Sequence, residues 1–239
     1  MESPFNLILL RHGQSVYNQE QRFTGWADVP LSPEGEAEAS RAGRLLLAEG
    51  LEFDIAFTSL LKRAIRTLEI VCEEMDLEWV PVVKAVELNE RHYGALQGRT
   101  REEVAAEVGE DQVRIWRRGY LERPPSLDYD DPRHPRFDER YRFLAPDRLP
   151  SAESLADVSD RVVPFWEDEI GPEIRSGRRV LVVSHGNTLR ALVKHLEGIS
   201  DDGIDAVEIP TGVPLVYHLG PDLRPRSRRI LSGEGTGRI

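Results

Sequence analysis

The stretch FNLILLRHGQS, residues 5–15, decides the expected fold, because a short apolar run ends there in chemically active residues. The run Phe5–Leu10 is typical of a strand buried on both faces of a sheet. Arg11, His12 and Gly13 follow at once. Ligands bind outside the carboxyl ends of strands in open α/β sheets, so these three residues are expected at a binding site. Taken alone, the motif is equally compatible with an ordinary surface turn.

Each residue of this motif has a physical use. Neutral imidazole can act as a nucleophile near physiological pH without a separate activating base, which makes His12 a candidate nucleophile. Arg11 offers a planar cation suited to phosphate. Gly13 is expected to let the backbone approach a ligand closely.

Strand and helix patterns alternate along the rest of the chain. Further strands are expected at Asp54–Thr58, Trp79–Val83, Arg179–Ser184 and Pro214–Leu219. Helices are expected from Ser32 (N-cap) and Pro33 to near Gly50, and at Leu61–Met75, Leu155–Ile170 and Leu189–Leu196. This alternation predicts an α/β fold, a mostly parallel sheet with helices on both faces.

Residues 1–239 are expected to form a single domain. Residues 123–150 are rich in proline and charge and lack periodicity, and we interpret them as a long excursion packed over the site. Residues 232–239 are rich in glycine and are expected to form a short mobile tail.

Composition limits the classes of partner. The chain has 31 Lys and Arg against 42 Asp and Glu, a formal net charge of −11, so nucleic acid and anionic membranes are not expected partners. No apolar run is long enough to span a membrane. The single cysteine, Cys72, cannot form an intramolecular disulfide and is expected to be a buried small hydrophobe. A cytoplasmic protein that binds a small anion is therefore expected.

Two further motifs repeat the strand-end pattern. In VVSHGNTLR, residues 182–190, His185 and Gly186 follow an apolar run and precede a helix. A histidine there could donate a hydrogen bond to a phosphoryl oxygen, although a helix-capping role is the simpler alternative. In FTSLLKRAIRTL, residues 57–68, Arg63 follows another strand end and could reach the same phosphate.

Together these motifs resemble the histidine phosphatase superfamily. Other segments narrow the resemblance to its cofactor-dependent phosphoglycerate mutases, namely FTGWADVPLS (residues 23–32), LNERHYGALQG (88–98), WRRGY (116–120), ESL (153–155) and IPTGVPLVY (209–217). The resemblance extends from about Phe5 to Leu219 and keeps the family's order of motifs. It implies a phosphoglycerate mutase-like fold and a small phosphoglycerate substrate. Members of the family usually have a longer tail after the last strand, which is thought to close over the site. This chain departs from them in having only a short, glycine-rich tail.

The resemblance implies a role for each matching residue. His12 would be the phosphoacceptor, primed by 2,3-bisphosphoglycerate, and Arg11, Arg63 and His185 would hold the transferring group. Glu90 would be the general acid and base. The expected phosphate and substrate contacts are Gly13, Ser15, Asn18, Thr24, Gly25, Arg91, His92, Tyr93, Arg101, Arg117, Arg118, Gly186 and Asn187.

Alternatives remain open from the residues themselves. Glu90 and Arg91 could be a surface ion pair, and Arg117 and Arg118 a solvated helix face. A phosphatase, in which water accepts the phosphoryl group, and a catalytically silent binding protein share this fold. No metal is expected, because the six histidines show no HExxH or similar ligand spacing. The family that the chain resembles often forms homodimers or homotetramers, and the sequence does not distinguish these from a monomer.

Overall fold

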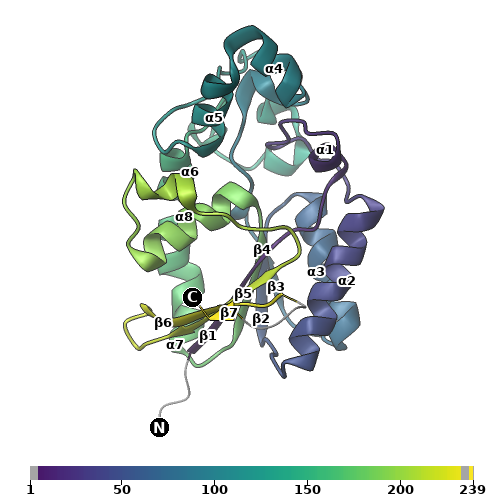
Figure 1. Ribbon diagram of the computed structural model, residues 1–239, viewed down its shortest axis with the longest axis vertical. Coiled ribbons are helices and arrows are strands. Elements are labelled where there is room, and N and C mark those ends of the chain that lie inside the picture. The colour runs from purple at the N-terminus through teal and green to yellow at the C-terminus, as the bar shows by residue number, and fades with distance from the viewer. Residues whose placement is uncertain (1–4, 233–236, 239) are drawn as a thin grey trace.

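The structure, a computed structural model, describes residues 5–232 and 237–238 and confirms the expected α/β fold. Seven strands of this described part form one sheet in the order β3-β2-β4-β1-β5-β6-β7 (Figure 1). Their bounds are β1 Phe5–Arg11, β2 Ile55–Thr58, β3 Val82–Lys84, β4 Val180–Ser184, β5 Pro214–Leu219, β6 Pro225–Ile230 and β7 Gly237–Arg238.

The parallel half of the sheet positions the site. Strands β1 and β4 are parallel neighbours, and β4 also pairs in parallel with β2, which pairs in parallel with β3. Arg11 at the end of β1 stands opposite Ser184 at the end of β4. The register therefore brings the residues that follow the two strands, His12 and His185, to the same edge of the sheet.

The antiparallel half was only partly expected. Strand β5 pairs antiparallel with β1, as β6 does with β5 and β7 with β6. The sequence of β6, PRSRRI, is polar and shows no apolar alternation, so its pattern did not predict a strand. Of the predicted mobile tail, residues 233–236 and 239 lie outside the described residues, and Gly237–Arg238 form β7.

Helices cover both faces of the sheet (Figure 1). Their bounds are α1 Val16–Gln19, α2 Pro33–Ala48, α3 Lys62–Met75, α4 Arg101–Val108, α5 Glu110–Arg118, α6 Leu155–Phe165, α7 Gly171–Arg175 and α8 Gly186–Glu197. Alternate residues of β1 face opposite cores: Leu7 and Leu9 pack with α6 and α8, whereas Ile8 and Leu10 pack with α2 and α3. The buried side chain of Cys72 lies in the second core, as predicted.

Local sequence explains where most of these helices begin and end. Ser32 caps α2 by accepting a hydrogen bond from the Gly35 N–H, and Pro33 occupies its first turn, as predicted. The single helix predicted for Leu155–Ile170 is instead interrupted. After Pro164, which has no N–H to donate, α6 ends and the turn Trp166–Ile170 becomes a π-helix.

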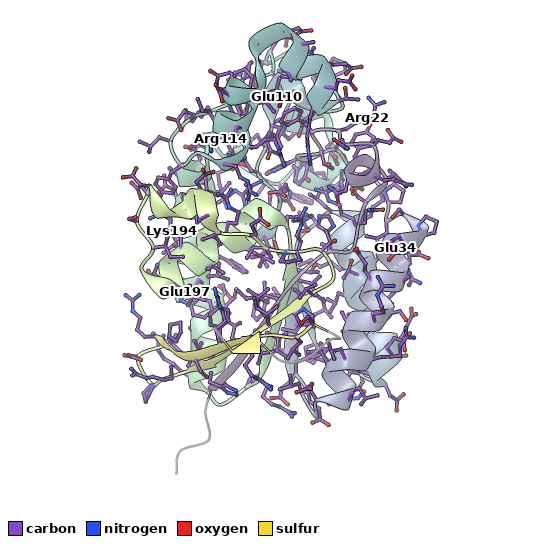
Figure 2. The ribbon with its side chains drawn as sticks, viewed as in Figure 1. Arg22, Glu34, Glu110, Arg114, Lys194 and Glu197 are labelled. Carbon is purple, nitrogen blue, oxygen red and sulfur yellow. The ribbon has the colours of Figure 1, made fainter. Side chains whose placement is uncertain are left out.

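Helices α1, α4 and α5 are short and lie beyond the carboxyl edge of the sheet. They form the upper part of the molecule in Figure 1. Arg22 and Arg114 mark its two flanks (Figure 2). Six 3-10 turns connect the described elements, at Val86–Leu88, Gly94–Leu96, Pro135–Phe137, Glu139–Tyr141, Pro146–Arg148 and Gly203–Ala206.

The excursion over residues 123–150 packs on the outer side of the loop that follows α1. The ring centroids of Tyr141 and Trp26 lie 4.8 Å apart, and the Tyr141 hydroxyl accepts a hydrogen bond from Asn89 Nδ2 at 3.0 Å. Within residues 5–232 and 237–238, no helix combines the length and apolar character needed to cross a bilayer.

Candidate active site

His12 directly follows β1 and is buried, with 2% of its surface exposed. Its Nδ1 lies 2.6 Å from the Gly13 carbonyl oxygen. A carbonyl can only accept, so Nδ1 carries the proton and Nε2 presents a lone pair. Arg63 Nε approaches this Nε2 at 3.3 Å. The ring is therefore held with its nucleophilic nitrogen beside a cation.

The charge state of His12 suits nucleophilic attack. Burial, together with the nearby guanidinium groups of Arg63 and Arg11, lowers the pKa of His12 well below its ordinary value of 6.5. The imidazole is thus neutral at physiological pH, and no separate base is needed to deprotonate it.

His185 follows β4 in the same way and is fully buried. The rings of His12 and His185 meet edge to face, with centroids 4.9 Å apart. Burial, Arg63, His12 and Arg11 lower the pKa of His185 well below 6.5. Its Nε2 lies 2.7 Å from Ser59 Oγ, whereas its buried Nδ1 has no hydrogen-bond partner among the described residues.

Two arginines flank His12. Arg11 Nη1 donates to the Ile209 carbonyl at 2.8 Å. Arg63, in the first turn of α3, donates to the carbonyls of Ala27 and Gly25 at 2.9 and 2.8 Å. Burial lowers the pKa of Arg63 to about 10, which leaves it cationic at neutral pH. Both cations are fixed before any substrate binds.

Glu90 reaches the site from the loop after Val86–Leu88. Its Oε1 accepts from the N–H groups of Arg91 and Asn187 at 2.8 and 3.2 Å. Its backbone carbonyl accepts from Trp26 Nε1 at 2.5 Å. These contacts hold a carboxylate at the wall of a cavity in which the other charges are mostly positive.

The cavity has a volume of about 250 Å³ and opens at the carboxyl edge of β1 and β4. Seven arginines line it against two glutamates, so it attracts a small polyanion. The predicted site residues that line it are Arg11, His12, Asn18, Thr24, Gly25, Arg63, Glu90, Tyr93, Arg101, Arg117, Arg118, Gly186 and Asn187.

The other predicted residues lie behind the cavity wall. A Cβ on Gly13 would meet the Gly35 oxygen at 2.1 Å, so the close approach at this glycine is to α2. Ser15 caps α1 and is paired with Asn18 in a capping box. His92 is buried, and burial lowers its pKa to about 3. His185 does not line the cavity, and its ring lies against the His12 ring.

Arg91 acts on the cavity from behind. It is fully buried, and its Nη2 donates to the Tyr93 hydroxyl at 2.9 Å and to the Arg117 carbonyl at 2.8 Å. Arg190, a cavity residue that the pattern analysis did not single out, donates to the Arg118 carbonyl at 2.9 Å. The two cations thus hold the carboxyl end of α5, where helix carbonyls favour positive charge.

Other lining residues were also not predicted. They are Arg22, Phe23, Glu208, Ile209 and Pro210. Phe23, Ile209 and Pro210 belong to segments already quoted for their resemblance. Arg22 and Glu208 adjoin those segments, and only adjacency to a motif could have pointed to them. None of the residues of the 123–150 excursion lines the cavity.

The described residues contain no cluster of three or more His, Cys, Asp or Glu side chains arranged to hold a metal ion. The polar groups around His12 fit a phosphate instead. The buried Arg11 Nε, Thr24 Oγ1 and His185 Nδ1 all lack partners within the described part of the chain. A tetrahedral oxyanion bound beside His12 would offer acceptors to such groups.

Comparison with solved structures supports the fold. The chain matches a mycobacterial glucosyl-3-phosphoglycerate phosphatase with a TM-score of 0.72 and 22% identity, over 96% of this chain and 98% of that one. It matches an alpha-ribazole phosphatase from Shigella flexneri with a TM-score of 0.66 and 22% identity, over 92% and 95%.

Sequence comparison finds a relative of higher identity and a matching family model. A 2,3-bisphosphoglycerate-dependent phosphoglycerate mutase from Nitratidesulfovibrio vulgaris (strain DSM 19637 / Miyazaki F) is 58% identical over 225 residues, which cover 94% of this chain and 90% of that protein. The model of the histidine phosphatase superfamily (branch 1) matches residues 7–131 and 128–220. The chain therefore belongs to the histidine phosphatase superfamily.

Proposed function

We propose that this protein interconverts 3-phosphoglycerate and 2-phosphoglycerate through a phosphohistidine on His12. The observation that carries the proposal is a neutral, buried imidazole whose Nε2 lone pair stands in an arginine-lined cavity beside Glu90. The 58% identity of this chain to a 2,3-bisphosphoglycerate-dependent phosphoglycerate mutase supports the same reaction.

Two half-reactions share the residues around His12. In the first, Glu90 takes the proton from the substrate hydroxyl as that oxygen attacks the phosphohistidine, the phosphorus–nitrogen bond to His12 breaks, and 2,3-bisphosphoglycerate forms. In the second, His12 Nε2 attacks the other phosphate of this bisphosphate, the phosphorus–oxygen bond breaks, and Glu90 returns the proton to the leaving oxygen. Arg11, Arg63 and His185 hold the oxygens of the transferring group while charge spreads over them.

The far end of the cavity is proposed to bind the rest of the substrate. Arg101, Arg117, Arg118 and Tyr93, which line the cavity, are proposed to form that end. Phosphoglycerate carries a carboxylate at one end and a phosphate at the other, so it needs cations at both. Arg91 and Arg190 are proposed to keep the α5 end in place for this purpose.

The remaining phosphate contacts come from two loops. Asn18, Thr24 and Gly25 belong to the segment after β1, and Gly186 and Asn187 begin α8. Gly13, Ser15 and His92 are proposed to support the site from behind the wall. The N-terminus of α8, where the Asn187 N–H donates to Glu90, also favours an anion.

The primer 2,3-bisphosphoglycerate fits the same cavity, because it differs from the substrate by one more phosphate. It supplies the phosphoryl group that loads His12, and no metal is invoked. A cytoplasmic location, in keeping with the one reduced cysteine, is part of the proposal. A homodimer or a homotetramer, as against a monomer, stays a prediction.

Priming tests the proposed reaction. Enzyme first freed of phosphate should convert 3-phosphoglycerate only after addition of trace 2,3-bisphosphoglycerate, and the rate should survive EDTA. A coupled assay of 2-phosphoglycerate measures it. Release of inorganic phosphate in place of 2-phosphoglycerate would identify a phosphatase. The absence of both products would favour a catalytically silent binding protein.

A substitution tests the proton carrier. Glu90→Gln should still accept label from radiolabelled bisphosphate yet turn over about 10²–10⁴-fold more slowly, because the amide cannot shuttle a proton. Glu107→Gln, which removes an exposed carboxylate paired with Arg99, is the matched control and should keep its activity. Full turnover by Glu90→Gln would exclude Glu90 from proton transfer.

A further inference from the structure

The hydroxyl of Ser59 lies against the second histidine and is fully enclosed. Ser59 stands between the end of β2 and the start of α3, and none of its surface is exposed. Its Oγ lies 2.7 Å from His185 Nε2. None of the roles assigned above uses this residue.

The hydrogen-bond partners of Ser59 determine where its proton points. Ser59 Oγ accepts from the Leu61 N–H at 3.2 Å. Its own hydrogen still needs an acceptor, since a buried hydroxyl without one is costly. His185 Nε2 is the acceptor that the described residues offer it. Ser59 therefore donates, and Nε2 accepts with its lone pair.

The direction of the hydrogen bond from Ser59 determines which nitrogen of the His185 imidazole carries the proton. A neutral imidazole has one N–H and one lone pair, so an accepting Nε2 leaves the proton on Nδ1. That Nδ1 is buried and has no partner among the described residues. The edge-to-face contact with the His12 ring, 4.9 Å between centroids, places this ring beside the nucleophile.

We propose that Ser59 is a positioning residue, which keeps the proton of His185 on Nδ1 as a hydrogen-bond donor for the phosphoryl group bound at His12. Without the serine hydroxyl, the ring can place its proton on Nε2 and turn a lone pair toward the anionic oxygens. A lone pair there repels the group that an N–H would stabilise. The role of the donor rests on the proposed phosphoryl transfer, whereas the position of the proton does not.

The proton is located first, without substrate. Long-range proton–nitrogen NMR spectra of the unliganded protein, labelled with ¹⁵N in its histidine rings, should show Nδ1 of His185 protonated and Nε2 unprotonated. His185→Gln assigns the signals. A proton on Nε2 would overturn the proposal whatever reaction the protein catalyses.

Kinetics then test the consequence. Ser59→Ala should slow the single-turnover labelling of His12 by 2,3-bisphosphoglycerate by about 10–100-fold, the usual range for a partner that orients a functional histidine. The KM for 3-phosphoglycerate should stay within about twofold, and Ser59→Thr, which keeps a hydroxyl, should recover part of the rate.

A matched control separates positioning from general packing. Ser159→Ala removes another buried hydroxyl, which donates to the Leu155 carbonyl within α6, and should label at the normal rate. If Ser59→Ala labels as fast as Ser159→Ala and keeps the Nδ1 proton, Ser59 does not position His185. If Ser59→Ala does not fold, the spectra of the unaltered protein still decide the proton's place.

Discussion

His12-Gly13 and His185-Gly186 follow neighbouring parallel strands and look alike in sequence, yet the ring nitrogens of the two histidines have different partners in the structure. His12 Nδ1 donates to a carbonyl, which leaves a lone pair on Nε2. His185 Nε2 lies 2.7 Å from the Ser59 hydroxyl, which on our proposal leaves an N–H on Nδ1. In the proposed reaction one ring attacks phosphorus and the other holds its oxygens. The partner of the nitrogen that faces away from the site decides the role.

The glycines of the two motifs differ as well. Gly13 is pressed against the backbone of α2, with no room for a Cβ. Gly186 opens α8, and a Cβ there would meet only the Arg11 guanidinium, at 3.4 Å. The first glycine serves packing, and the second borders the substrate cavity.

Replacing each histidine is the strongest way to test the comparison. His12→Ala should abolish both mutase activity and labelling from radiolabelled bisphosphate, because the phosphoryl carrier is gone. His185→Ala should still be labelled, about 10²–10³-fold more slowly, as expected for loss of one oxyanion donor. Rapid-quench labelling measures both. Label on a residue other than 12 in His12→Ala would contradict the assignment.

Replacing each glycine should separate packing from function. Gly13→Ala forces a backbone clash with Gly35 and should lower the free energy of unfolding by about 1–3 kcal/mol or more. Gly186→Ala should change it by less than about 1 kcal/mol, because a side chain can yield and alanine suits a helix. Urea denaturation measures both changes. Equal losses of stability would mean that the two glycines share one role.

Gly186→Ala should also affect catalysis, since its new methyl group touches Arg11. Its KM for 3-phosphoglycerate should rise while the fold is retained. An unchanged KM would show that Arg11 tolerates displacement.

The two rings should also share a pH dependence of the free energy of unfolding. Their pKa values lie below 6.5 in the folded protein. As pH falls below 6.5 the unfolded chain binds protons that the folded chain does not, so stability is present above that pH and is lost below it. Each ring should contribute up to about 1.4 kcal/mol per pH unit.

Denaturation by urea at about pH 7.5 and about pH 5 measures this loss. His12→Gln should lose less stability between the two than the unaltered protein does. Ser159→Ala is the control, because it removes a buried hydroxyl that does not titrate in this range. A His12→Gln slope equal to that of the unaltered protein would mean that the folded His12 already takes up a proton near neutral pH.

The same pKa direction bears on activity. Because His12 stays neutral until well below pH 6.5, kcat/KM should not fall on acidification through pH 6.5 on account of this ring.

Sequence alone determined the fold class and the centre of the site. Strand and helix periodicities are local, and the apolar runs that end in His12 and His185 are buried strands whose shared edge follows from parallel pairing. The resemblance to a known family added Glu90, Tyr93, Arg101, Arg117 and Arg118, all of which line the cavity.

Only the tertiary structure decided what each group does there. Ser59 and His185 are 126 residues apart in the chain, and Arg190 and the Arg118 carbonyl are 72 apart. No local pattern encodes such contacts, and the same holds for the packing of Gly13 on α2 and for the polar edge strand β6. The proton on an imidazole follows its nearest partner, which for His12 is the adjacent Gly13 but for His185 is Ser59, from a segment distant in sequence.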